Sequence, residues 1–170
     1  MAATLSSLIS LAVNATLKDG ATIGEVTHDI SFKAANALTN GNGANQANQA
    51  YAARRTIPAS SNESLDLAGG LTNAFGTTLT FTAIKAIAIV AAAANVNDVI
   101  VGGAASNAFA SWVGDPTDTV KVKPGGMLLI AAPNAAGFAV TASTADLLKI
   151  ANSSSGSGVT YDIVIVGATA

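Results

Sequence analysis

Cysteine is absent from this sequence of 170 residues, and histidine occurs once, at His28. Without cysteine the chain forms no disulfide, and with one histidine a zinc site is close to excluded, because zinc takes cysteine, histidine and carboxylate ligands. A Ser-His-Asp triad would have to use His28, yet no G-x-S-x-G motif presents a nucleophilic serine. We therefore expect His28 to be an exposed or capping residue.

Charge and aromatic side chains are also scarce. Charged residues make up 11% of the chain and aromatic residues 5%, whereas a soluble domain carries roughly 25% charged residues. Half of the residues are apolar, but many of these are alanine, which buries little area per side chain. A surface this poor in charge suits a protein that its partners cover. The net charge of −2 and the single adjacent basic pair, Arg54 and Arg55, give no basis for nucleic-acid binding.

No apolar run is long enough to span a membrane, which needs about 18 residues. The nearest candidate, LTFTAIKAIAIVAAAA at 79–94, contains two threonines and a central Lys85. Its large side chains alternate with small ones, as in Ile87 and Ile89 against Ala86 and Ala88, and period two is typical of a strand. Lys85 interrupts the bulky face beside Ile84, which predicts a β-bulge. We expect no membrane partner.

Strand patterns separated by turn residues continue to the C-terminus. They lie at 99–104, 117–123, 127–133, 137–142, 146–152 and 159–168, and earlier ones lie at 28–34, 51–59 and 62–69. The stretch 79–94 and the strand at 99–104 flank a short turn-rich cluster and are expected to form a hairpin. This spacing predicts an all-β fold, a β-sandwich over 51–170, either jelly-roll or immunoglobulin-like.

Residues 1–50 form a looser N-terminal arm with little capacity to build a core. Leu5, Leu8, Ile9 and Ala12 fall at helical spacing, which predicts a short amphipathic helix in an otherwise extended arm. The polar segment at 38–50 contains Asn-Gly twice and is expected to be mobile, or ordered only by contact with another molecule. The arm is therefore expected to dock on another chain.

Acidic residues do not form a recognisable site. Asp115 and Asp118 are a close acidic pair, but they lack the calcium-loop pattern, and Asp115 before Pro116 is typical of a turn. A pair of carboxylates could serve a glycan hydrolase, but spacing along the chain cannot reveal one, and Trp112 is the single tryptophan that could stack on a sugar. We predict no catalytic residues, no metal, no cofactor and no enzyme activity.

Three runs in the second half resemble small virion proteins of tailed bacteriophages. They are RTIPASSNESLDLAGGLTNAFGTTLTF at 55–81, VIVGGAASNAFASWVGDPTDTVKVKPGGMLLIAAPNAAG at 99–137 and DLLKIANSSSGSGVTYDIVIVG at 146–167, and the span that contains them is about two thirds of the chain. The resemblance implies a β-sandwich that decorates or cements the phage head as a dimer or trimer, with the major capsid protein lattice as partner. The location it implies is the virion, assembled in the host cytoplasm. It brings no catalytic residue with it.

Five residues are candidate partner contacts under this hypothesis. Leu5, Leu8 and Ile9 of the arm would grip the lattice, together with the loop at 38–50. Phe109 and Trp112 would contact a subunit or the capsid, because tryptophan is enriched at interface hot spots. Packing within the chain explains both aromatic residues equally well. The main alternative function is a tail or fibre component that binds a host receptor through loop tips such as 104–116 and 133–137.

Overall fold

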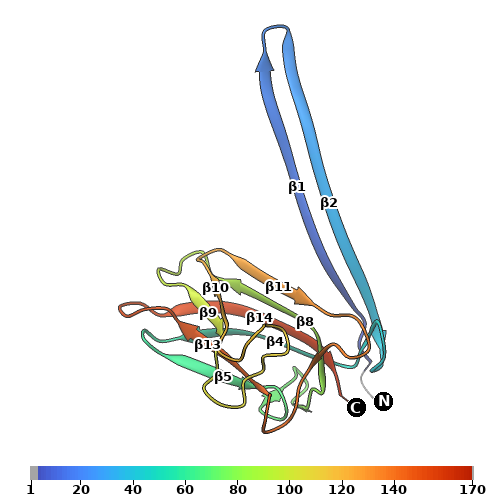
Figure 1. Ribbon diagram of the computed structural model, residues 1–170, viewed down its shortest axis with the longest axis vertical. Helices are drawn as coiled ribbons and strands as arrows, with labels where there is room; N and C mark the ends of the chain where they lie inside the picture. The colour runs from blue at the N-terminus through green and yellow to red at the C-terminus, as the bar shows by residue number, and fades with distance from the viewer. Residues whose placement is uncertain (1–3, 170) are drawn as a thin grey trace.

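The computed structural model describes residues 4–169 and is all-β, with no helix in that range. A body of two sheets encloses the core, and a long two-stranded hairpin projects from it (Figure 1). The all-β prediction is confirmed, and the two-sheet body is consistent with the expected sandwich. The projecting hairpin, residues 7–40, takes up most of the N-terminal arm expected at 1–50, and from here on the word arm means this hairpin alone.

The arm pairs β1 (Ser7–Ala21) with β2 (Gly24–Asn40) in one unbroken antiparallel register. The strand expected at 28–34 lies within β2. The helix expected around Leu5 to Ala12 is wrong, because this segment is the start of β1. Alternating apolar residues continue from Ile9 to Leu17, and this longer period-two pattern, paired along its whole length with β2, prevails over the brief helical spacing.

The segment after the arm is ordered by the chain itself. β3 (Gln46–Ala47) pairs in parallel with the end of β2. The Gln46 side-chain oxygen accepts a hydrogen bond from the Gly43 amide at 2.9 Å, and the Asn45 amide donates to the Pro133 carbonyl at 2.7 Å. The prediction of a mobile or partner-ordered loop at 38–50 is therefore wrong, since asparagine and glutamine here satisfy local backbone groups.

The body contains two principal antiparallel sheets. The four-stranded sheet has the order β10-β9-β13-β5, and the larger sheet has the order β11-β8-β14-β4 with β12 beside β8. The first contains β5 (Asn62–Asp66), β9 (Val99–Gly102), β10 (Thr119–Val122) and β13 (Leu147–Asn152). The second contains β4 (Gln49–Ile57), β8 (Ala83–Ala91), β11 (Met127–Ala131), β12 (Phe138–Ala139) and β14 (Val159–Ala168). A small ribbon joins β6 (Leu71–Thr72) to β7 (Thr78–Leu79).

Strand pairs of the body are nested along the chain. β4 pairs with β14, β5 with β13, β8 with β11, and β9 with β10. The hairpin expected between 79–94 and 99–104 is wrong, because β8 and β9 belong to different sheets. The chain turns the corner between them with side-chain support: the Asn95 amide group donates to the Thr160 carbonyl at 2.9 Å, and Asn97 donates to the Asn152 side chain at 2.9 Å.

Inward-facing side chains of both sheets form one core. Ile87 and Ile89 of β8 lie opposite Ile165 and Ile163 of β14, and all four are buried. Leu148 and Ile150 of β13 complete the core from the four-stranded sheet. The predicted division of 79–94 into a bulky face and a small-residue face is confirmed at the centre of β8, because Ile87 and Ile89 point into the core whereas Ala86 and Ala88 line the opposite face.

The predicted bulge at Lys85 is also present. The pairing of β14 with β8 shifts register between Val166 and Gly167, so Lys85 has no partner residue there. The Lys85 side chain is buried, and its ammonium donates to the carbonyls of Asn134 and Ala135 at 2.5 and 2.7 Å. Burial lowers the pKa of Lys85 because the charged form loses its hydration.

Replacing Lys85 by methionine tests this buried charge through its pH dependence. A lowered pKa means that folded Lys85 releases its proton before unfolded Lys85 does, so the unfolded state binds more protons just below the ordinary value of 10.5. The wild-type free energy of unfolding, relative to Lys85→Met, should therefore rise as the pH approaches 10.5. Urea titrations of both proteins between pH 8 and 10.5 measure this difference, and a flat or falling difference contradicts it.

A polar cluster ties the two sheets together at one side of the core. Glu63 of β5 accepts hydrogen bonds from Arg55 of β4, at 2.7 Å to Nε, and from the Tyr161 hydroxyl of β14 at 3.0 Å. The Arg55 guanidinium also donates to the Tyr51 hydroxyl at 3.1 Å. Burial, followed by the nearby Glu63 charge, raises the pKa of Tyr161. The cluster gives hydrogen-bond partners to polar groups that would otherwise be buried without one at the edge of the core.

Candidate interaction surface

The arm is a ribbon with two chemically different faces. Residues directly opposite each other in an antiparallel pair share a face, so the register assigns every side chain. One face, here called the apolar face, carries the pairs Leu11–Ala34, Val13–Phe32, Ala15–Ile30, Leu17–His28 and Asp19–Val26. The other, the polar face, carries the pairs Ser10–Ala35, Ala12–Lys33, Asn14–Ser31, Thr16–Asp29 and Lys18–Thr27.

Hydrogen bonds satisfy the polar face within the arm. The Thr16 hydroxyl donates to Asp29 at 2.8 Å and the Ser31 hydroxyl donates to Asn14 at 2.9 Å. Near the tip, the Lys18 ammonium donates to Glu25 at 2.9 Å. These exposed contacts hold the two strands in register, but each contributes little to stability in water.

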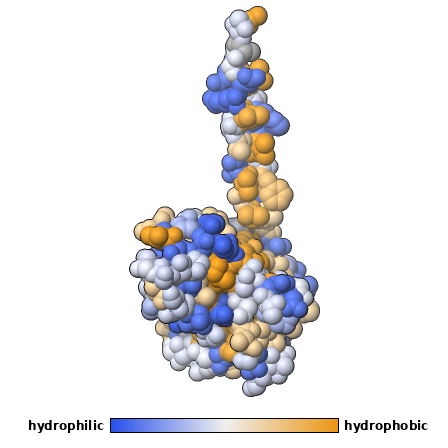
Figure 2. Space-filling view, turned by 60° about the vertical axis from the view of Figure 1, so that its left-hand side comes forward, coloured by the Kyte–Doolittle hydropathy of each residue, from blue (hydrophilic) through white to orange (hydrophobic). Residues whose placement is uncertain are grey.

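The apolar face has no cover from the body. Its six large aliphatic and aromatic side chains are between 45% and 66% exposed: Leu11, Val13, Leu17, Val26, Ile30 and Phe32. Figure 2 shows apolar side chains following one another along the arm. A two-stranded ribbon alone is marginally stable in water. A ribbon that also exposes its apolar face is expected to be covered when the protein works.

The base of the arm is anchored on the body. Leu38 and Ala47 are buried against Val166 of β14, and Leu5 and Ile9 pack around them. The Leu5 amide also donates to the Asn40 side-chain oxygen at 3.0 Å. Of the three residues expected to grip a lattice, Leu5 and Ile9 are therefore half-buried within the chain, whereas Leu8 is exposed.

Beneath the arm, the larger sheet turns a second apolar surface outward. The register aligns Met127, Val90, Asp162 and Arg54 in one row across β11, β8, β14 and β4, and Leu129, Ala88, Val164 and Ala52 in the next. We call this surface the outer sheet face. Its four large apolar side chains are between 37% and 75% exposed: Val90, Met127, Leu129 and Val164. The strands of an antiparallel sheet with one face in water normally alternate apolar and polar residues. The outer sheet face departs from this pattern and is a second candidate contact surface.

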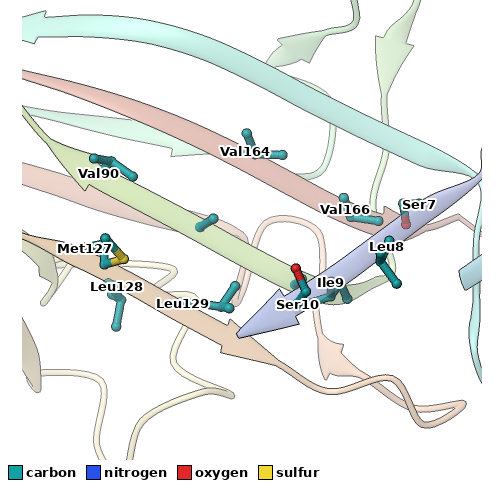
Figure 3. Close-up of a pocket in the computed structure, with 12 residues that line it drawn as sticks. Ser7, Leu8, Ile9, Ser10, Val90, Met127, Leu128, Leu129, Val164 and Val166 are labelled. Atoms are coloured by element: carbon teal, nitrogen blue, oxygen red, sulfur yellow. The ribbon is translucent and has the colours of Figure 1, made fainter. Parts of the chain in front are cut away.

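A groove joins the two surfaces where the arm leaves the body. It encloses about 280 Å³ and is lined by Ser7–Ser10 of β1 and by the outer sheet face. Figure 3 shows Leu8 and Ile9 crossing the end of β8, with Val164, Val90 and Leu129 beyond them. The apolar face of the arm and the outer sheet face are thus continuous through Ile9, Leu38 and Val166.

One ion pair interrupts the outer sheet face. Arg54 and Asp162 meet in a two-pronged contact, with Nε and one terminal nitrogen each 2.7 Å from a carboxylate oxygen. The hydrogen bonds with Arg54 lower the pKa of Asp162, and the same bonds raise the pKa of Arg54. The pair is exposed, and it borders the apolar rows on the β4 side.

The two aromatic candidates lie elsewhere. Phe109 is buried in the core, so the expectation that its side chain contacts a partner is wrong: it follows a loop but packs inward. Trp112 is half-buried against the same core, and its indole nitrogen donates to the Phe109 carbonyl at 3.0 Å. Intramolecular packing therefore accounts for Phe109, and Trp112 keeps part of its surface free.

The acidic residues and the histidine considered as possible catalytic or metal-binding groups form no common site. Asp115 accepts hydrogen bonds from the Thr117 amide and hydroxyl, and Asp118 accepts one from the Asp115 amide, which confirms the predicted turn. The Thr117 bonds lower the pKa of Asp115. His28 is exposed on the arm. Within residues 4–169, no cluster of three potential metal ligands and no helix able to span a membrane is found.

Sequence reasoning missed most of the residues that form these surfaces. The signal for the arm was the alternation from Ile9 to Leu17, which extends past the helical spacing near Leu5. The signal for the outer sheet face was IVIVGA at 163–168, apolar at both parities. A strand apolar on both sides is expected to be covered on both sides.

Comparisons with known proteins identify no relative. No protein-family model matches the chain. Neither the curated proteins nor the solved structures include a significant match.

Proposed function

We propose that this chain is a structural protein of a tailed-bacteriophage particle that coats the head lattice as a decoration or cement protein. The observation that carries the proposal is the arm, whose apolar face its own body leaves uncovered. Binding to neighbouring molecules in an assembly would remove this apolar face from water. The low charge of the sequence and the resemblance of residues 55–81, 99–137 and 146–167 to virion proteins support the same role.

The topology of the body supports this proposal. Numbered from β4, the eight main strands pair first with last, second with seventh, third with sixth and fourth with fifth. This nesting is the pattern of a ribbon folded over into a jelly roll, and we propose the jelly roll over the immunoglobulin-like alternative. Jelly rolls recur in viral capsid proteins, although a fold alone does not assign a function.

The proposed mechanism is bridging by many weak contacts. A capsid lattice repeats the same surface at fixed spacing, so each bound copy joins neighbouring subunits and the contacts reinforce one another. The partners are the major capsid protein and further copies of this chain, with no nucleic acid and no membrane. No catalytic step is part of this role.

The second candidate is a tail or fibre component that contacts a host receptor. Residues 104–108, 110 and 111, with Pro116, Thr144 and Ala145, line a shallow depression of about 410 Å³ at the loops of the body. Loops held on a rigid sheet scaffold are common recognition surfaces. This candidate would place the chain at the tail.

Gold labelling of intact virions tests the proposal. Particles of the phage that encodes the chain are incubated with an antibody against the body and viewed by electron microscopy, with particles from a deletion mutant as the control. We expect gold over the whole head. Gold at the tail or its tip would replace the decoration role with the receptor-binding one, and particles labelled no more than the deletion mutant would remove the virion role.

A further inference from the structure

We propose that the apolar face of the arm packs on the outer sheet face of a second copy of this chain, and that two copies do this reciprocally. The inference deepens the proposed structural role by naming a partner and its contact, but it depends only on the arm and the sheet. The pairing can therefore be tested without knowing where the chain lies in a virion.

The chain already uses this contact once, within itself. Ile9 and Leu38 begin the apolar face of the arm, and they pack on Val166, which belongs to the outer face of β14. The rest of both surfaces has the same chemistry but diverges, because the arm rises away from the body (Figure 1). A second arm would extend the same packing over the part of the sheet that the first arm leaves bare.

The dimensions of the two surfaces agree. From Leu11 to Ala21 the free part of the arm is roughly 35 Å long, at about 3.3 Å per residue. The strands it would cover, β8 and β14, have nine and ten residues, which corresponds to roughly 30 Å. One arm is therefore long enough to cross the outer sheet face of a neighbour.

The area favours a reciprocal pair over a single contact. Covering six arm side chains and four sheet side chains removes on the order of 1,000 Å² from water, at roughly 100 Å² each. A stable specific interface buries about 1,200–2,000 Å² in total. One arm-to-sheet contact falls short of this range, whereas two such contacts related by a two-fold axis reach it, and such a pair leaves neither apolar surface exposed.

The charge near the arm tip disfavours a lipid surface as the occupant. Asp19, Glu25 and Asp29 outnumber Lys18 in this region. Anionic membranes attract basic segments and repel acidic ones. A second copy of the chain, in contrast, has an exposed apolar face on its arm and an exposed outer sheet face, so each copy can cover both apolar surfaces of the other.

Matched charge variants test the proposal in solution. Val13 and Phe32 are directly opposite each other on the apolar face, and Asn14 and Ser31 are opposite each other one residue along, on the polar face. We expect the wild-type chain and the Asn14→Asp/Ser31→Asp variant to sediment at twice the monomer mass. The Val13→Asp/Phe32→Asp variant should dissociate with an affinity at least 100-fold weaker. None of these side chains packs against the body, so circular dichroism should report folded sheets in all three proteins.

Cross-linking tests which surfaces meet. Because the chain has no cysteine, single cysteines can be placed at Val13 or Asn14 on the arm and at Val164 on the sheet. Pairs of variants are mixed and treated with a short bis-maleimide, and the linked peptides are identified by mass spectrometry. We expect the Val13→Cys and Val164→Cys chains to cross-link at least ten-fold more than the Asn14→Cys and Val164→Cys chains.

Several outcomes would overturn the proposal. A wild-type monomer at tens of micromolar would do so, as would equal cross-linking from Val13→Cys and Asn14→Cys, or arm-to-arm products alone. Flotation of the wild-type chain with anionic vesicles, lost in Val13→Asp/Phe32→Asp, would assign the apolar face to lipid instead. A monomer that still labels the phage head would leave the decoration role intact and remove only the pairing.

Discussion

A chain whose arm is cut back to its base should remain folded and should no longer bind the particle. The change replaces residues 11–34 with Asn-Gly, a dipeptide that favours the tight turn of a two-residue hairpin. Ser10 and Ala35 are partners in the register, so the short hairpin keeps Ile9 and Leu38 on Val166. The removed residues at 11–20 and 22–34 are all exposed, and for this reason the thermal midpoint should change by no more than a few degrees.

Cosedimentation with particles purified from a deletion mutant measures the loss of binding. We expect the full-length chain to pellet with the particles and the shortened chain to remain in the supernatant. Binding should fall at least 100-fold, because a chain without the apolar face of the arm cannot pair and loses the avidity of two linked copies. The full-length Asn14→Asp/Ser31→Asp variant is the control, because it alters the polar face alone. Undiminished binding by the shortened chain would show that the body carries the contact and that the arm is dispensable.

Replacing Ile165 by alanine should cause the largest loss of stability. Ile165 is 0% exposed and lies in the middle of β14 between Ile87 and Tyr51. Truncating a buried isoleucine removes its transfer free energy and leaves a cavity, which together cost about 3–4 kcal/mol. Urea denaturation of Ile165→Ala against wild type measures the difference in the free energy of unfolding.

The adjacent residue provides the matched control. Val164 points to the opposite side of the same strand and is 44% exposed, so Val164→Ala should cost about 0.5 kcal/mol or less. If pairing occurs through the outer sheet face, the same variant should weaken self-association. Equal destabilisation by the two substitutions would mean that the outer sheet face is already packed in the isolated chain.

Local periodicity predicted the strands of the body well. The alternation at 79–94 identified which side chains of β8 face the core, and the displacement of Ile84 beside Lys85 identified the bulge. Both features depend on neighbours in the sequence. The partner of each strand does not, which is why β8 was expected to pair with the next strand along the chain, whereas it pairs with β11 and β14.

The arm and the aromatic loop show where such reasoning fails. Residues 5–12 fit a helical period over two turns and an alternating period over a longer distance, and only pairing with β2 decides between them. Phe109 follows a glycine- and alanine-rich loop that suggested exposure, yet it packs inward because the bridge between Ala108 and Leu147 draws this segment onto β13. The outer sheet face could not be predicted for a different reason. Its apolar residues have the same local sequence pattern as the core residues beside them, so the sequence does not show which of the two is exposed.

The nested pairing of the body also determines when the protein can fold. β4 is the first strand of the body to leave the ribosome and β14 is the last, yet β14 lies between β8 and β4 in the finished sheet. Contacts between such distant segments close slowly, because the loop-closure entropy is lost before the pairing stabilises the chain. During synthesis, β4 and β8 therefore remain without their shared neighbour until the segment from Val159 to Ala168 emerges. A chain interrupted before Val159 would present two unpaired strand edges and no centre for its larger sheet.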